Sequence, residues 1–249
     1  MTPRASLPTP AAEAVPAAGP PGARRPSTGL AVLPPLFHLA LRLDGQPCLV
    51  VGGGPIGARK AAALLQCGAV VTIVSPQTCA QVDELGVRVL RRPYLAGEVA
   101  GYRLVVTATG DPEVDREVYL DGERAGVLVN AADDPASCSF LMPAVLRRGD
   151  VSIGVSTAGV SPWLAGWVKR LIGEAVGAEV ADLAAIVGET RAAVRAAGVS
   201  SEGLDWAGLV EGALWPLLQA GDLEPARAAA KRWAGDVLDA GSGAHDSPE

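Results

Sequence analysis

Histidine is nearly missing from this sequence, with 2 residues in 249. A catalytic metal site built from several histidines is therefore excluded, and a serine–histidine hydrolase is disfavoured. Aromatic residues make up 4% of the chain, too few for the stacking surface of an RNA-binding module. The four cysteines show no Cys-x-x-Cys spacing, so we expect reduced thiols in a cytoplasmic protein rather than a disulfide scaffold.

Basic residues are outnumbered by acidic ones, 21 against 27, and the formal net charge is -6. A general nucleic-acid binder usually carries a basic surface, so we expect no nucleic-acid partner. The sequence contains no charge-free run of about 20 apolar residues, so we expect no membrane span. Apolar residues nevertheless make up 49% of the chain, which is enough to bury a core.

The two ends of the chain have the composition of disordered tails. Residues 1–29 are rich in Pro, Ala, Ser and Gly and have no apolar periodicity. They lack the apolar stretch of about 7–15 residues that a signal peptide needs, and their prolines disfavour an organelle transit helix. Residues 241–249 are polar. We predict disorder in both segments.

Between the tails, short apolar runs alternate with helical or loop segments at the spacing of β-α-β units. This alternation predicts an α/β fold with a doubly wound, Rossmann-like parallel sheet. After a connector over 143–150 and a sixth apolar run over 151–155, the pattern becomes all-helical, with Ser161 as N-cap and Pro162 at the first helical position. The predicted strands are 47–51, 69–74, 87–90, 103–108 and 127–130, and the predicted helices of the C-terminal region are 163–176, 182–197, 204–220 and 223–240.

A glycine-rich loop follows the first predicted strand, with the sequence Gly52-Gly53-Gly54-Pro55-Ile56-Gly57. It matches G-x-G-x-x-G, in which the first glycine allows a tight turn, the second lets a pyrophosphate approach, and the third lets the helix pack closely. The helix N-terminus then offers amide donors to the phosphates. We predict a dinucleotide site; the alternative is a glycine-rich turn without a ligand.

The acidic residue expected about 20 positions further on, at the end of the second strand, is missing. That strand is predicted to end at Val74-Ser75-Pro76, where Ser75 can bind a ribose hydroxyl less strongly than a carboxylate would. No arginine follows directly to favour a 2′-phosphate. The residues themselves therefore leave NAD and NADP open.

Two acidic residues, Asp133 and Asp134, follow the fifth predicted strand, at the edge where open α/β sheets bind ligands. Asp134-Pro135 is typical of an Asx turn. The pattern alone leaves Asp133 undecided between a turn and a functional role.

Together these motifs resemble the siroheme synthase N-terminal family, which comprises precorrin-2 dehydrogenases, many of them also sirohydrochlorin ferrochelatases. The resemblance extends over about residues 33–240, and the order and spacing of its motifs make it specific. The matching segments are 33–37, 43–45, 50–54, 58–60, 105–109, 111–112, 129–130, 133–135, 138–140, 143–144, 156–157, 161–162, 217–221 and 224–228.

The resemblance implies an NAD-binding Rossmann domain over 30–142, a dimerisation region over 143–180 and a helical C-terminal domain over 181–240. It implies an intertwined homodimer that holds the tetrapyrrole in a cleft. The implied reaction oxidises precorrin-2 to sirohydrochlorin with NAD as the hydride acceptor, and bifunctional members then insert Fe2+ to give sirohaem. The alternatives are a monofunctional dehydrogenase and, in other classes, an NAD-sensing regulatory module or a dimerisation scaffold that keeps the Rossmann core without activity.

The key aspartate of the family falls on Asp133, where a carboxylate can accept the proton that accompanies hydride loss. No metal ligands from the protein are expected, because the macrocycle supplies the nitrogens. We expect the cofactor to contact Gly52, Gly53, Gly54, Pro55, Ile56, Gly57, Ser75, Thr107, Ala108, Thr109 and Asn130.

The substrate that the resemblance implies is a polycarboxylate, so we expect cations and hydroxyls to bind it. For the cations the alternative is a solvated turn or helix face. The candidates are Arg147, Arg148, Ser156, Thr157, Lys169, Arg170, Arg191 and Arg195.

Two departures from the family matter. A regulatory phosphoserine of some relatives falls on Thr157, which puts that regulation in doubt. The methyltransferase domain fused to some relatives would need about another 200 residues. We therefore expect precorrin-2 to come from a separate uroporphyrinogen methyltransferase.

Overall fold

A computed structural model describes residues 36–132 and 134–242. The predicted tail 1–29, Asp133 and residues 243–249 of the second predicted tail lie outside the described residues. The chain divides into two units, residues 1–36 and 37–249, and the helices and strands of the described residues all belong to the second unit.

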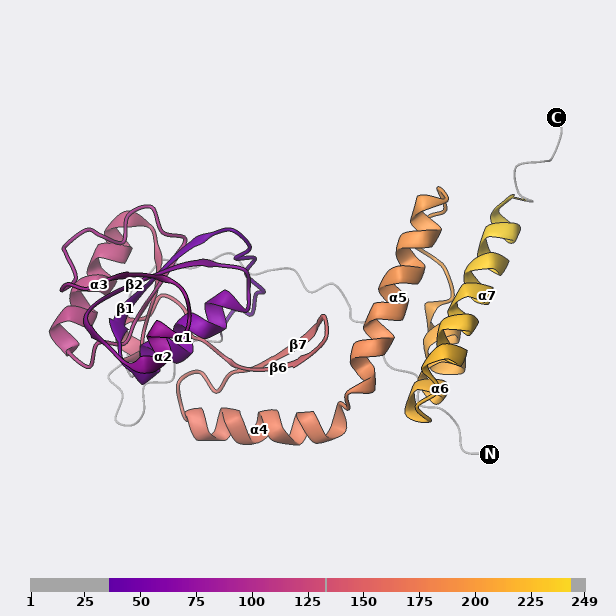
Figure 1. Cartoon of the computed structure of the whole chain (residues 1–249). Coiled ribbons are helices and arrows are strands. Elements are labelled where there is room, and N and C mark those ends of the chain that lie inside the picture. The colour runs from indigo at the N-terminus through magenta and orange to yellow at the C-terminus, as the bar shows by residue number, and fades with distance from the viewer. Residues whose placement is uncertain (1–35, 133, 243–249) are drawn as a thin grey trace, which may run out of the picture. The chain divides into compact units, whose positions relative to one another are not determined.

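In the first half of this unit, helices flank a parallel sheet (Figure 1). The sheet has five strands in the order β3-β2-β1-β4-β5. The prediction of a Rossmann-like α/β fold is confirmed. The chain adds strands outward from β1 in both directions, so a crevice opens between the carboxyl ends of β1 and β4, where such sheets bind ligands. The strands are β1 (Pro47–Gly53), β2 (Val70–Thr78), β3 (Arg88–Leu90), β4 (Leu104–Thr107) and β5 (Leu128–Ala131).

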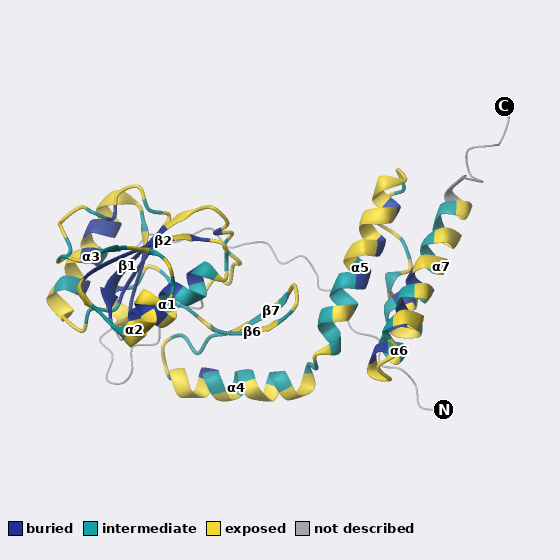
Figure 2. Cartoon of the chain, viewed as in Figure 1, coloured by how far each residue is buried: buried dark blue, intermediate teal, exposed yellow. Residues whose placement is uncertain are grey.

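The sheet is buried on both faces, which explains why its strands are continuous apolar runs. Successive residues of β1 point to opposite faces. Val50 packs in a cluster with residues of helix α1 (Pro55–Leu65), whereas Leu49 and Val51 pack in a cluster that includes helix α3 (Pro112–Ala125). Figure 2 shows the buried strands in dark blue between their helices.

Strand β2 is longer than predicted. It continues beyond Val74 to Thr78 because its pairing with β1 contains a bulge: Val51 pairs with Val74, but Gly53 pairs with Thr78. Residues inside a bulge leave the regular ladder, so Pro76 does not end the strand. The bulge is held in part by the Ser75 hydroxyl, which donates to the carbonyl oxygen of Gln77 at 2.6 Å.

The predicted connector 143–150 is mostly a strand. β6 (Ala144–Arg148) pairs antiparallel with β7 (Val151–Val155), the sixth apolar run, in a hairpin separate from the main sheet. The turn between them uses Gly149 at a φ of +55°, a conformation that glycine adopts readily. Sequence patterning missed β6 because its residues lack a long apolar run.

Helix α4 (Pro162–Ala175) follows the hairpin, and the predicted cap is confirmed: Ser161 Oγ accepts from the Leu164 N–H at 3.2 Å. The elements after α4 are α5 (Glu179–Ala196), the π-helix η2 (Gly208–Leu214), α6 (Trp215–Gln219) and α7 (Leu223–Ser242), and two short helices, α2 (Ala80–Asp83) and the 3-10 helix η1 (Pro135–Ser137), belong to the first half. The elements after α4 pack around Ile186, Leu209 and Leu214.

The helix predicted over 204–220 is divided into a π-helix and an α-helix, and Pro216 at their junction lacks the N–H that a continuous α-helix needs. Helix α7 ends two residues later than predicted. No helix within the described residues is both long and apolar enough to cross a membrane.

Candidate functional site

The glycine loop between β1 and α1 has three glycines that the fold requires and one that leaves space. A Cβ on Gly53 would collide with the carbonyl oxygen of Gln77. Gly52 has a φ of +115°, and a Cβ there would collide with the carbonyl oxygen of Ala108. A Cβ on Gly57 would collide with the Gly52 carbonyl oxygen. At Gly54, by contrast, an added Cβ would meet no atom within 4 Å. This pattern agrees with a turn that lets a ligand approach the backbone at Gly54.

A cavity of about 660 Å³ opens beside this loop, and we call it the glycine-loop cavity. It lies at the crevice predicted by the strand order. Six of the residues predicted to contact the cofactor line it: Gly52, Gly53, Gly54, Ser75, Ala108 and Thr109. The rest of the lining consists of Val51, Val74, residues 76–79, Pro93, Tyr94, Asp111 and Val114, none of which was predicted to contact the cofactor.

Thr107, at the end of β4, is fully buried and helps to fix the loop that follows this strand. Its hydroxyl donates to the carboxylate of Asp115, which also accepts from the Thr109 hydroxyl at 2.7 Å. Asp111 caps α3, since its Oδ1 accepts from the Glu113 N–H at 2.9 Å. These bonds fix the backbone that faces the cavity at Ala108 and Thr109.

Tyr94 forms part of the cavity wall and is held by a buried carboxylate on α3. Its hydroxyl donates to Asp121 at 2.8 Å, and Asp121 also accepts from the Gly97 N–H at 2.5 Å and from Arg124 at 2.6 Å. Burial by itself raises the pKa of Asp121, but the bonds from Gly97, Tyr94 and Arg124 outweigh it and leave the pKa lowered. The residue is therefore a buried anion that fixes the loop bearing Tyr94.

A second cavity, of about 740 Å³, lies at the carboxyl end of β5, and we call it the β5-end cavity. Ile56, Asn130, Ser156 and Thr157, all predicted site residues, line it. Pro55, Gly57 and Thr107 line neither of the two cavities. Asp133 lies outside the described residues, but its neighbours Ala132 and Asp134 line the β5-end cavity.

The loop after β5 is tied together by Asn130 and Cys138. Asn130 is buried, and its side-chain amide donates to the Phe140 carbonyl oxygen at 3.0 Å. The Cys138 thiol lies 3.2 Å from both the N–H and the carbonyl oxygen of Ala131. Burial raises the pKa of this thiol, so it is a hydrogen-bonding group and not a thiolate. Asp134 makes the predicted turn, with its Oδ1 accepting from the Ala136 N–H at 3.0 Å.

The cations chosen from the sequence line neither of these cavities. Arg148 instead donates to the carbonyl oxygens of Val176 at 3.1 Å and Gly173 at 3.1 Å, at the end of α4. Arg147 reaches the Cys67 sulfur at 3.4 Å, and Arg191 donates to Ser201 at 3.3 Å. Lys169 and Arg170 lie on α4, and Arg195 lies on α5.

Arg59 and Lys60, which sequence reasoning missed, do line the β5-end cavity. The sequence contained a clue to these two residues, because Arg59 and Lys60 lie three and four positions after Ile56 and share one face of α1 with it. The glycine motif ends at Gly57, so it draws attention to Ile56 as a loop residue and not to its neighbours on the helix.

Comparison with known proteins agrees with this arrangement. Residues 39–144 match a family described as "Putative NAD(P)-binding". A siroheme synthase of Methylococcus capsulatus is 35% identical over 167 residues, which are 66% of this chain and 35% of that protein. The siroheme synthase of Chromobacterium violaceum is 34% identical over 198 residues, 77% of this chain and 42% of that protein. Siroheme synthases are therefore relatives of this chain in sequence.

The resemblance inferred from the motifs is thereby confirmed, although the chain spans less than half the length of these relatives. Among solved structures, "SirC, precorrin-2 dehydrogenase" aligns with a TM-score of 0.63 and 23% identity. The alignment covers 79% of this chain and all of that structure. At this identity the structural match supports the fold.

Proposed function

We propose that this chain is an NAD-dependent dehydrogenase that converts precorrin-2 into sirohydrochlorin. The observation that carries the proposal is the similarity to siroheme synthases in a chain whose glycine-loop cavity lies at the ligand-binding edge of the sheet. The name of the structural neighbour, a precorrin-2 dehydrogenase, agrees with this activity.

The residues of the glycine-loop cavity fit a dinucleotide. The space above Gly54 admits a pyrophosphate, and the first turn of α1 directs amide N–H groups and its positive end toward it. When bound, NAD+ accepts the hydride that leaves the macrocycle.

Asp133 is our candidate for the general base. It follows β5, and the residues on either side of it line the β5-end cavity. A carboxylate there accepts the proton released when hydride leaves the carbon framework. Asn130, fixed by its bond to Phe140, holds the start of this loop in place.

We further propose that Fe2+ is inserted into sirohydrochlorin in the same cleft. The iron is then a substrate, with the macrocycle nitrogens as its ligands, and the chain needs only a group that removes the pyrrole protons. Asp133 is again the candidate. Within the described residues, no cluster of three His, Cys, Asp or Glu side chains is placed to hold a metal ion.

A homodimer is the proposed assembly, with residues 143–180 as the dimerisation region between an NAD-binding domain over 30–142 and a helical domain over 181–240. Its support is the apolar face of α4, where Trp163, Trp167 and Leu171 are exposed and the two indole rings stack 6.5 Å apart. The four free thiols agree with a reducing cytoplasm. A methyltransferase reaction must supply precorrin-2.

The test is to supply precorrin-2 and NAD+ with and without Fe2+ and to follow the absorbance of NADH and of the macrocycle. We expect NADH and sirohydrochlorin, and sirohaem when iron is added. Dehydrogenation without iron insertion would indicate a monofunctional dehydrogenase. NAD+ binding with no change in the macrocycle would overturn the proposal and favour a regulatory NAD-binding module.

A further inference from the structure

The β5-end cavity contains a positive pair that the predicted substrate-binding residues do not include. Among the described residues that line it, Arg59 and Lys60 are the cations, and Asp134 is the carboxylate. Asp134 is occupied as a turn cap through its bond to the Ala136 N–H. The described side chains that line this cavity therefore bring two positive charges and one negative charge together, and Asp133, the proposed base, would add a second negative charge.

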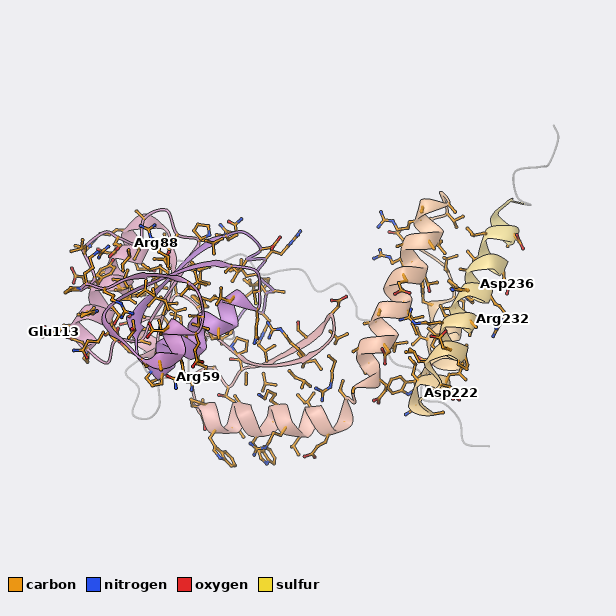
Figure 3. All side chains as sticks on the ribbon, in the orientation of Figure 1. Arg59, Arg88, Glu113, Asp222, Arg232 and Asp236 are labelled. Atoms are coloured by element: carbon orange, nitrogen blue, oxygen red, sulfur yellow. The ribbon has the colours of Figure 1, made fainter. Side chains whose placement is uncertain are left out.

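Both cations are held in place by α1. They lie in the second turn of this helix, which is anchored on the sheet by Ala58, Ala61 and Leu64. Arg59 is exposed on α1 (Figure 3), so its guanidinium is free to reorient toward a ligand. Lys60 is half-buried, with its Nζ 3.4 Å from the Met142 sulfur.

The positive charge of Lys60 affects the electrostatics of the loop after β5. Burial raises the pKa of the Cys138 thiol, and the positive charge of Lys60 opposes that rise. Lys60 therefore lies close enough to influence the same loop that carries Asn130 and Asp134. Ser156 and Thr157, which come from the segment after β7, also line the cavity. Their hydroxyls bond within their own loop: Ser156 Oγ accepts from the Ala158 N–H at 3.2 Å, and Thr157 Oγ1 donates to the carbonyl oxygen of Ser161 at 3.1 Å.

We propose that Arg59 and Lys60 form the carboxylate-recognition pair of the substrate site and bind acidic side chains of the tetrapyrrole. The inference rests on the proposed function. An arginine fork can hold a carboxylate through two parallel bonds, and a lysine supplies a compact charge beside it. The other cations considered from the sequence line neither cavity, so the recognition charge comes from α1.

The experiment compares the wild-type protein with Arg59→Gln, Lys60→Gln and the double variant. Glutamine keeps a polar side chain and a similar helix propensity but removes the charge. Arg88→Gln is the matched control, because Arg88 is an exposed arginine on β3 outside both cavities (Figure 3). Thermal unfolding verifies that each variant is folded.

The readouts are KM and kcat for precorrin-2, the Kd of sirohydrochlorin by absorbance titration, and the Kd of NAD+. We expect KM and the sirohydrochlorin Kd to rise about 10-fold for each charge removed, with kcat and NAD+ affinity within about twofold of wild type. Lys60→Arg should recover most of the affinity, whereas Arg59→Lys keeps the charge but loses the two parallel bonds and should recover only part of it. The salt dependence of sirohydrochlorin binding should be shallower in the double variant.

Three results would overturn the proposal that Arg59 and Lys60 form the carboxylate-recognition pair. Unchanged tetrapyrrole affinity in the double variant, with an active wild type, rejects the pair and leaves the proposed function standing. Equal losses of tetrapyrrole and NAD+ affinity would show a structural role for these residues. A wild-type protein that neither oxidises precorrin-2 nor binds sirohydrochlorin would reject the proposed function and the pair with it.

Discussion

The hydroxyl of Tyr94 donates a hydrogen bond at 2.8 Å to the carboxylate of Asp121 on α3. Tyr94 lines the glycine-loop cavity, whereas Asp121 is buried behind it, 5% exposed. Asp121 also accepts from the backbone N–H of Gly97, so one carboxylate fixes two points of the loop over residues 91–98. The shape of the cavity thus depends on a charge that does not itself face the cavity.

Asp121→Asn should reduce the free energy of unfolding by about 1–3 kcal/mol at pH 7. The neutral amide oxygen accepts hydrogen bonds less strongly than a carboxylate, and the amide NH2 group would face the donors Tyr94, Gly97 and Arg124. The folded-state pKa of Asp121 is lowered, so its stabilisation is complete above the unfolded pKa of about 4 and is lost as the pH falls through the folded pKa. The difference between wild type and variant should therefore shrink in acid. Urea unfolding from pH 7 to pH 3 measures it.

Glu123→Gln, on the exposed face of the same helix, is the control and should follow the wild-type curve. Glu98 also contributes to the pH dependence of stability in this range, because its hydrogen bonds with Arg92 lower its pKa. A difference between Asp121→Asn and wild type that stays constant from pH 7 to pH 3 would contradict the role given to the Asp121 charge.

The two loop glycines Gly54 and Gly57 should respond differently to alanine. Gly54→Ala adds a methyl group in open space at a backbone conformation that alanine tolerates, so the melting temperature should be unchanged. The same methyl group occupies the space required by the pyrophosphate, so the Kd of NAD+ should rise at least about 10-fold. Calorimetric titration measures this loss.

Gly57→Ala should instead destabilise the fold, because its Cβ would collide with the Gly52 carbonyl oxygen. Displacing that backbone costs about 1–3 kcal/mol, which lowers the melting temperature by several degrees.

If Gly54→Ala bound NAD+ as well as wild type, the cofactor would have to lie elsewhere.

Asp133→Asn should lower the rate of NADH formation from precorrin-2 by about 100-fold or more, the usual contribution of a general base. NAD+ affinity should be retained, because the glycine-loop cavity is unaffected. Asp236→Asn, on the exposed side of α7 (Figure 3), is the control for a lost surface charge. Wild-type turnover by Asp133→Asn would assign the base to another residue.

The apolar face of α4 should be required for dimer formation. Trp163 is 70% exposed and stacks on Trp167, so burial of both rings in a second copy would contribute substantially to association. Trp163→Ser combined with Trp167→Ser should convert a dimer into a monomer in analytical ultracentrifugation. Val70→Ser, which removes one exposed apolar residue from β2, should not. A wild-type monomer at micromolar concentration would exclude this interface.

The sheet and the glycine loop were predictable because each depends on a local pattern. Val50 and Val51 in a continuous apolar run predict a buried strand, and the spacing of Gly52 and Gly57 predicts the turn that comes after it. Ser161 and Pro162 predict the start of α4 for the same reason, since a cap is a contact between residues three positions apart.

Features that depend on register or on distant packing were not predictable. The bulge that carries β2 past Pro76 is set by pairing with β1, and β6 is a strand because β7 pairs with it. Likewise, the bond from Tyr94 to Asp121 joins residues 27 positions apart. No local pattern contains such information.

The sequence alone determined that this chain has a Rossmann-like sheet and a glycine loop, because periodicity and backbone conformation are local properties of the residues. Only the tertiary structure decided which charges accompany the site. Arg148 turns to the carbonyls at the end of α4, whereas Arg59 and Lys60 line the cavity. Where a long charged side chain ends depends on the packing of distant elements, and that is decided only when the chain is folded.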